Sequence, residues 1–191
     1  FIKLVEFDPA AGTVFNNNSY SGDFTVEFWH KKTSSGGTYP CMLLKGPNNT
    51  NDQDMRIYTS GGTIYCEVVF SSGGSLNWPT ITGSAGTTTN WQHYATVRDG
   101  DTLRFYINGV ELGNTSCTGT IRNDWNSFYL GAGYVGSVGH VSYHGGYYDN
   151  FSISSTCRYP NGTTFTPAQA TVNYGTSTTT TATGSLLSTT S

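Results

Sequence analysis

The stretch NWQHYATVRDGDTLRFYINGVEL, residues 90–112, decides the fold class of this chain. Side chains along residues 91–98 divide into two alternating sets, which is the two-residue period of a β-strand. Asp99-Gly100 is a type I′ hairpin signal, and the alternation resumes along residues 103–107. Asn108-Gly109 is a second tight turn, followed by another alternating segment. The stretch therefore predicts a meander of three antiparallel strands.

The rest of the chain has the same period. Short segments rich in β-branched and aromatic residues are predicted to be strands: 1–7, 24–32, 41–45, 55–59, 63–70, 128–133 and 147–154. No segment repeats apolar residues at helical spacing for three turns. Many short strands joined by glycine-rich turns predict an all-β protein, a sandwich or a barrel of antiparallel strands.

The composition excludes several partners. Of 191 residues only 11% are charged, the net charge is -3, and no basic stripe occurs, so we expect no nucleic-acid partner. No apolar run approaches the roughly 20 residues of a membrane span. Aromatic residues make up 14% of the chain, enough to build a core. Low charge with many β-formers and turn-formers predicts a domain that works outside the cytoplasm.

Four cysteines occur, at Cys41, Cys66, Cys117 and Cys157, with no CxxC pair among them. Two disulfides are one interpretation, with three connectivities that the sequence does not distinguish. Four small buried apolar side chains are the other.

Residues 173–191 are low-complexity Thr/Ser sequence and are set apart from a domain over residues 1–172. A flexible or O-glycosylated linker is one interpretation of this tail. An ordered tail would need partners for its backbone groups, which predicts packing on a neighbouring domain or subunit, or addition of a strand to a sheet.

Several motifs in their order resemble the concanavalin A-like, laminin G-type jelly roll. They are SGDFTVEFWHKK (21–32), the meander of residues 90–112, FYLGAG (128–133) and GYYDNFSIS (146–154). The ending CRYPNGTTFTP (157–167) also looks like that of such domains in phage tail proteins. The resemblance covers about residues 1–170. It implies two antiparallel sheets packed face to face, one of them concave, and non-catalytic recognition of glycans or proteins, often beside a calcium ion.

Catalysis is not expected. Glycoside hydrolysis needs a pair of carboxylates about 5–10 Å apart, and related jelly-roll glucanases carry them in an E-x-D-x-E pattern. Here the four glutamates, Glu6, Glu27, Glu67 and Glu111, lie singly on different segments. Glu27 and Glu67 could still meet across strands. Because no segment carries the spacing of a catalytic carboxylate pair, we predict that the protein is not an enzyme.

Calcium is the metal that the resemblance suggests, held by oxygen ligands before the closing strand. This chain has Asp149-Asn150 there, one carboxylate and one amide, and Asp8 and Asp23 are further candidates. His140 and His144 lie in a glycine-rich segment, so we interpret them as solvated loop residues rather than metal ligands.

Glycan binding uses aromatic faces flanked by polar side chains. We select aromatic residues in expected loops, with the polar neighbours of one of them: Trp78, Trp125, Asn123, Asp124, Tyr134 and Tyr143. Trp29 and Trp91 lie on expected strands and are assigned to the core.

Together these patterns predict a module of an extracellular, secreted or virion-surface appendage that recognises a cell-surface glycan or receptor. The alternative is a structural module without a soluble ligand, which holds a homo-oligomer or a larger assembly together.

Overall fold

The computed structural model describes residues 2–4, 15, 20–34, 39–46, 53–86, 89–124, 128–135, 139–141 and 143–169. The candidate residues Asp8 and Trp125 and the tail of residues 173–191 lie outside these ranges. Within them the chain forms strands and one 3-10 turn, Pro160–Gly162. No helix in the described part of the chain is long and apolar enough to cross a membrane.

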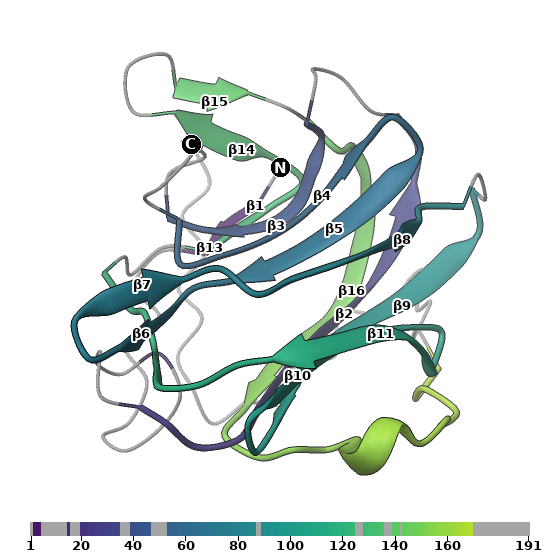
Figure 1. The fold of residues 1–191 in the computed structure, drawn as a ribbon. Helices are drawn as coiled ribbons and strands as arrows, with labels where there is room; N and C mark the ends of the chain where they lie inside the picture. The colour runs from purple at the N-terminus through teal and green to yellow at the C-terminus, as the bar shows by residue number, and fades with distance from the viewer. Residues whose placement is uncertain are drawn as a thin grey trace.

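Two antiparallel sheets face each other and form the sandwich (Figure 1). The six-stranded sheet has the order β1 (Ile2–Leu4), β13 (Phe128–Leu130), β3 (Cys41–Lys45), β4 (Met55–Ser60), β5 (Thr63–Val68), β8 (Thr80–Ser84). The five-stranded sheet has the order β11 (Val110–Ser116), β10 (Thr102–Ile107), β9 (Trp91–Asp99), β2 (Phe24–Lys32), β16 (Gly146–Ser154). The predicted all-β, two-sheet antiparallel jelly-roll sandwich is confirmed.

Smaller sheets complete the fold, and their strands are β12 (Thr120–Ile121), β6 (Phe70–Ser72), β7 (Ser75–Asn77), β14 (Gly133–Val135) and β15 (Gly139–Val141). The predicted strand over residues 63–70 is two strands. They separate at Val69, whose backbone N–H donates to the Asp54 carbonyl at 2.8 Å instead of continuing the ladder. The predicted strand over residues 128–133 is interrupted at Gly131, which has a φ of 80°.

The meander that decides the fold class forms as predicted. Strands β9, β10 and β11 pair consecutively through two short turns. Asn108 and Gly109 have φ values of 53° and 78°, as the type I′ turn requires. The first turn differs from the predicted type I′: Asp99 ends β9, the central residues are Gly100 and Asp101, and of these only Gly100 has a positive φ, 62°.

The main core lies between the two sheets. Phe24, Val26 and Phe28 of β2 are fully buried there, as are Ile57 and Ile64 of the opposite sheet. Burial of each such side chain stabilises the fold by about 1.5–3 kcal/mol.

A second apolar cluster lies on the outer face of the five-stranded sheet. Residues 155–169, which we call the C-terminal strap, leave β16 and carry the 3-10 turn (Figure 1). Tyr159 and Phe165 of the strap stack at 3.4 Å and pack with Tyr106, Ala95 and Val97, which are fully buried. The strap therefore buries the second face of this sheet over part of β9 and β10, and residues 93–98 are buried in both alternating sets.

The assignment of Trp29 and Trp91 to the core is wrong. Both belong to the outward set of their strands and are partly exposed, and Trp29 Nε1 donates to the Ala168 carbonyl of the strap at 2.8 Å. A period of two identifies the sets but not which set faces the core.

All four cysteines lie in described residues, and none is paired with another. Cys41, Cys66 and Cys117 are buried, as expected for small apolar side chains, and Cys157, which belongs to the strap, is half-buried. Burial raises the pKa of the Cys66 thiol to about 12, and its sulfur lies 3.2 Å from the Thr96 hydroxyl.

Candidate ligand-binding site

Aromatic side chains gather on the outer face of the six-stranded sheet, which we call the tyrosine face. Its floor is formed by Tyr58 and Tyr65, directly opposite each other on β4 and β5, and by Arg56 and Glu67, opposite each other one row away. This arrangement follows from the hairpin at Gly61-Gly62, since strand alternation places these positions on one side of the sheet.

The aromatic rings of the tyrosine face are ordered by their own contacts. Tyr58 and Tyr65 stack with their centroids 4.7 Å apart and an interplanar angle of 6°. Tyr39 meets Tyr58 edge to face at 5.9 Å. The Arg56 guanidinium lies 4.4 Å from the centre of the Tyr58 ring, a cation–π contact.

An ion pair lies beside these rings. Arg56 Nε is 2.5 Å from Glu67 Oε2, and the Tyr58 hydroxyl donates to Glu67 Oε1 at 3.0 Å. Burial, followed by the nearby Glu67 carboxylate, raises the pKa of Tyr58, so its phenol stays protonated and serves as a donor. The carboxylate and the guanidinium neutralise each other within the face.

The border of the tyrosine face is open. Tyr39 and Tyr143 are 49% and 48% exposed, and Tyr143 forms an isolated bridge with Cys41 of β3. On the opposite side Thr80 and Thr82 of the edge strand β8 are exposed. Aromatic surface with a few placed hydroxyl and charged groups is the usual chemistry of a sugar site.

Two of the predicted aromatic residues lie at the border of this face. Trp78, 39% exposed, precedes β8, whereas Tyr143 lies beside β3. Because β4 and β5 separate β3 from β8, the two residues are on opposite sides of the face and do not form one platform. Tyr134 is on β14, and its side chain is outside the described part of the structure.

The predicted polar neighbours of Trp125 are engaged within the chain. Asn123 Oδ1 accepts from Lys45 Nζ at 2.6 Å, and Lys45 is also 2.5 Å from Asp54. Asp124 pairs with Arg122 at 2.5 Å. Lys45 and Asp54 are 1% and 0% exposed, so Asn123 supports a buried charge pair.

The calcium candidates that the structure describes, Asp23 and the Asp149-Asn150 pair, do not converge. Asp23 Oδ1 accepts from the Gly100 backbone N–H at 2.8 Å. Asp149 pairs with Trp29, six positions along β2 from Asp23, which corresponds to about 20 Å. Asn150 has a φ of 51°, and its backbone N–H donates to Asp149 Oδ1 at 2.8 Å. Within the described ranges no three His, Cys, Asp or Glu side chains are grouped to hold a metal ion.

The buried carboxylate of Glu27 lies on the other outer face, under the strap. Its Oε2 accepts from the Tyr159 hydroxyl at 2.7 Å and lies 3.3 Å from His93 Nε2. Its Oε1 forms an ion pair with Arg158 and accepts from the Ser152 hydroxyl at 3.2 Å. The side chain is 7% exposed, so we interpret Glu27 as the anchor that holds the strap.

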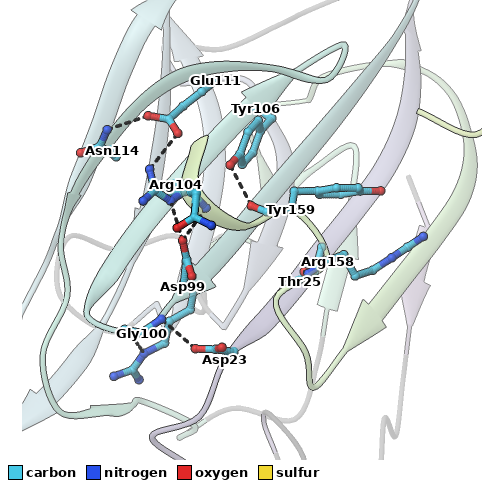
Figure 2. A network of polar contacts seen from close by, with 12 residues as sticks. Asp23, Thr25, Asp99, Gly100, Arg104, Tyr106, Glu111, Asn114, Arg158 and Tyr159 are labelled. Atoms are coloured by element: carbon cyan, nitrogen blue, oxygen red, sulfur yellow. Dashed lines mark hydrogen bonds and ion pairs between the residues drawn. The ribbon is translucent and has the colours of Figure 1, made fainter. Parts of the chain in front are cut away.

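A second set of contacts holds the 3-10 turn of the strap (Figure 2). The Asn161 backbone N–H donates to Asp99 Oδ2 at 2.8 Å, and Arg104 bridges Asp99 and Glu111 at 3.1 and 2.9 Å. The Asn161 N–H and Arg104 lower the pKa of Asp99. The Tyr106 hydroxyl donates to the Tyr159 carbonyl at 2.9 Å.

Glu27 and Glu67 therefore do not meet. They lie on the outer faces of different sheets, with the sandwich between them, and each is engaged by an arginine and a tyrosine. Glu111 is paired with Arg104, and Glu6 lies outside the described residues.

The interpretation of His144 as a solvated residue is wrong. It is 3% exposed, and its ring lies 4.8 Å from that of the equally buried His30. The glycine-rich segment around it is packed against strand β2, with Thr33 N–H donating to the Gly145 carbonyl at 3.0 Å. His140 is on β15, with its side chain outside the described part.

Comparisons with known proteins agree with this architecture. The family model of the concanavalin A-like lectin/glucanases superfamily matches residues 9–161. A search of curated proteins finds no significant match.

Solved structures show the same fold at low sequence identity. The CBM40 domain of the Ruminococcus gnavus IT-sialidase is 14% identical, with a TM-score of 0.55 over 73% of this chain and 79% of that domain. A Bacteroides ovatus protein whose description assigns it to carbohydrate binding is 16% identical, with a TM-score of 0.55 over 82% of this chain and 41% of that protein. The binding domain of botulinum neurotoxin serotype D is 10% identical, with a TM-score of 0.57 over 81% and 36%.

This chain thus spans less than half of the latter two, and the likeness establishes the fold alone. The family match covers most of the chain and includes every strand of both sheets except β1, together with the meander and the first part of the strap. The chain belongs to the concanavalin A-like lectin/glucanase superfamily.

Proposed function

We propose that this protein is a non-catalytic glycan-recognition module and that the tyrosine face is its binding surface. The observation that carries the proposal is the contrast between the outer faces. The strap covers much of one, whereas the other presents the partly exposed Tyr65, stacked on the buried Tyr58, beside a neutral ion pair and an open border. Sugars need apolar surface for their C–H faces and placed polar groups for their hydroxyls, and this face provides both.

The similar structures support the ligand class. The Ruminococcus gnavus CBM40 domain has been solved bound to α2,3-sialyllactose, at 14% identity and a TM-score of 0.53 to this chain. We extend only carbohydrate binding in general to this protein. An extracellular or virion appendage that contacts a cell-surface glycan or receptor is the setting we propose, which the low charge of the chain favours.

A glycan array with the full chain tests the proposal, run once with calcium and once with a chelator. Tyr65→Ala should abolish the array signals, since it removes the stacked aromatic ring that lies beside the exposed edge strand β8. Tyr147→Ala is the matched control: this tyrosine is 54% exposed but lies on β16 of the other sheet. A blank array in both conditions would reject the proposal. Loss of signal in chelator alone would place calcium in the binding site.

Assembly is the second candidate function, and one observation favours it. Leu76 of β7 and Trp78, which directly follows this strand, are 38% and 39% exposed, and β7 has one described neighbour, β6. An exposed apolar edge strand is a surface on which another chain can pair. Light scattering of the full chain and of a Leu76→Ser/Trp78→Ser variant tests this: an oligomer that becomes a monomer supports assembly, and a monomer throughout rejects this edge as an interface.

A further inference from the structure

A step lies between Tyr65 and the edge strand β8. Tyr65 lies on β5, which pairs with β4 on one side and with β8 on the other. Tyr58 on β4 covers one face of the Tyr65 ring, so the other face is turned toward β8. Thr82 lies directly across from Tyr65, and Thr80 and Ser84 are its neighbours on the same side of β8. All three are exposed and short, so the aromatic ring stands beside a floor of hydroxyl groups.

The charges around this step cancel. Strands β4, β5 and β8 contain one cation, Arg56, and one anion, Glu67. Arg56 Nε is 2.5 Å from Glu67 Oε2, and the Tyr58 hydroxyl occupies Glu67 Oε1. The cation of the face is therefore already committed to a carboxylate of the protein.

This pairing discriminates between classes of sugar. A sugar carboxylate placed on the step would approach Glu67, whose charge Arg56 already balances, so the face would then carry one uncompensated negative charge. A charge desolvated without a partner is costly. A neutral ring adds no charge, and its C–H face packs on Tyr65 while its hydroxyls both donate to and accept from threonine hydroxyls.

We propose that the step between Tyr65 and β8 binds a neutral sugar ring and disfavours acidic sugars. The inference rests on the proposed function and names the ligand class of the same face. It separates this chain from the CBM40 domain, which has been solved bound to a sialylated ligand.

The test uses the full chain on an array that pairs each neutral glycan with the same glycan carrying a terminal sialic acid. The neutral member should bind at least about tenfold more tightly, which corresponds to about 1.4 kcal/mol. Glu67→Gln keeps the shape of the side chain but leaves Arg56 without its carboxylate, so this difference should narrow several-fold. Tyr65→Ala should lose both members of each pair.

A second pair of variants does not depend on the buried ion pair. Thr82→Leu fills the floor beside Tyr65 and should abolish binding, whereas Ser116→Leu, at an exposed position on the edge strand β11 of the other sheet, should preserve it. Both positions are exposed on an edge strand, so each variant should fold.

The outcomes separate this inference from the proposed function. Preference for the sialylated members, lost in Tyr65→Ala, would overturn the neutral class and leave glycan recognition standing. Glycan binding that survives both Tyr65→Ala and Thr82→Leu would overturn the step as the site. An array without any signal would reject the proposed function itself.

Discussion

The two outer faces of the sandwich each carry a buried glutamate paired with an arginine and a tyrosine, but the partners come from different parts of the chain. On the five-stranded sheet Glu27 is buried under the strap, with Arg158 and Tyr159 supplied by a segment more than a hundred residues away in sequence. On the six-stranded sheet Glu67 receives Arg56 and Tyr58 from the neighbouring strand. The first pairing fixes a covering segment in place, and the second leaves the face open to a ligand.

An Arg–Glu–Tyr cluster therefore does not by itself identify a ligand-binding site. A buried carboxylate must have partners wherever it occurs. What distinguishes the tyrosine face is the open border around its cluster, where Tyr39 and Tyr143 are about half exposed.

The largest expected effect is on the covered face. Glu27→Ala would leave Arg158, the Tyr159 hydroxyl and His93 without their common partner. Arg158 is 43% exposed and water can solvate its charge, so we expect a loss of about 3 kcal/mol in the free energy of unfolding. Urea unfolding measures it. Asp101→Ala is the control, because this carboxylate is 80% exposed and 3.8 Å from Arg98, a pair worth roughly 0.5 kcal/mol. A loss below about 1 kcal/mol for Glu27→Ala would show that the strap is not held by this residue.

Local sequence patterns predict the contacts of the tyrosine face better than those of the face under the strap. The Gly61-Gly62 hairpin, with strand alternation, is sufficient to place Tyr58 opposite Tyr65 and Arg56 opposite Glu67, although we selected loop aromatics instead. No local pattern connects Glu27 to Arg158, because that contact depends on how the chain returns after β16. The same long-range packing explains the wrong assignment of Trp29 and Trp91, which alternate correctly but face the strap side.

Two buried histidines contrast with Glu27 and Glu67, whose carboxylates have hydrogen-bond partners. His30 Nε2 and His144 Nδ1 are buried without a hydrogen-bond partner among the described residues. Burial, followed for His30 by His144 and for both by Lys32, lowers the pKa of His30 to about 3 and that of His144 to about 4. Protonation of either ring is therefore unfavourable in the folded protein.

The sign of the pH effect follows from linkage. Histidine in the unfolded chain has a pKa of about 6.5, so below this pH the unfolded chain binds protons that the two buried rings of the folded protein do not bind. The free energy of unfolding is therefore fully retained above pH 6.5 and falls as the pH drops toward the pKa values of the folded state. Between pH 7.5 and 5.5 each histidine should cost about 1.3 kcal/mol, and the pair about 2–3 kcal/mol. Chemical unfolding across this range measures the loss, and a His30→Gln/His144→Gln variant should have a flatter profile. An equal slope in the variant would assign the loss to other groups.

The smallest effect on stability is expected at the open border of the tyrosine face. This prediction tests most directly whether the two outer faces have different roles. Tyr39→Ala and Tyr143→Ala each remove a ring that is about half exposed, so the free energy of unfolding should change by roughly 0.5–1 kcal/mol. Binding of glycans long enough to extend from the step across the Tyr58–Tyr65 stack should weaken in the same variants, because these rings extend the apolar surface on the β3 side of the stack. A single sugar ring on the step should bind unchanged. Thermal unfolding and array titration of the same samples separate the two readouts. Large destabilisation with unchanged binding would mean that both faces serve the fold and that neither is the ligand surface.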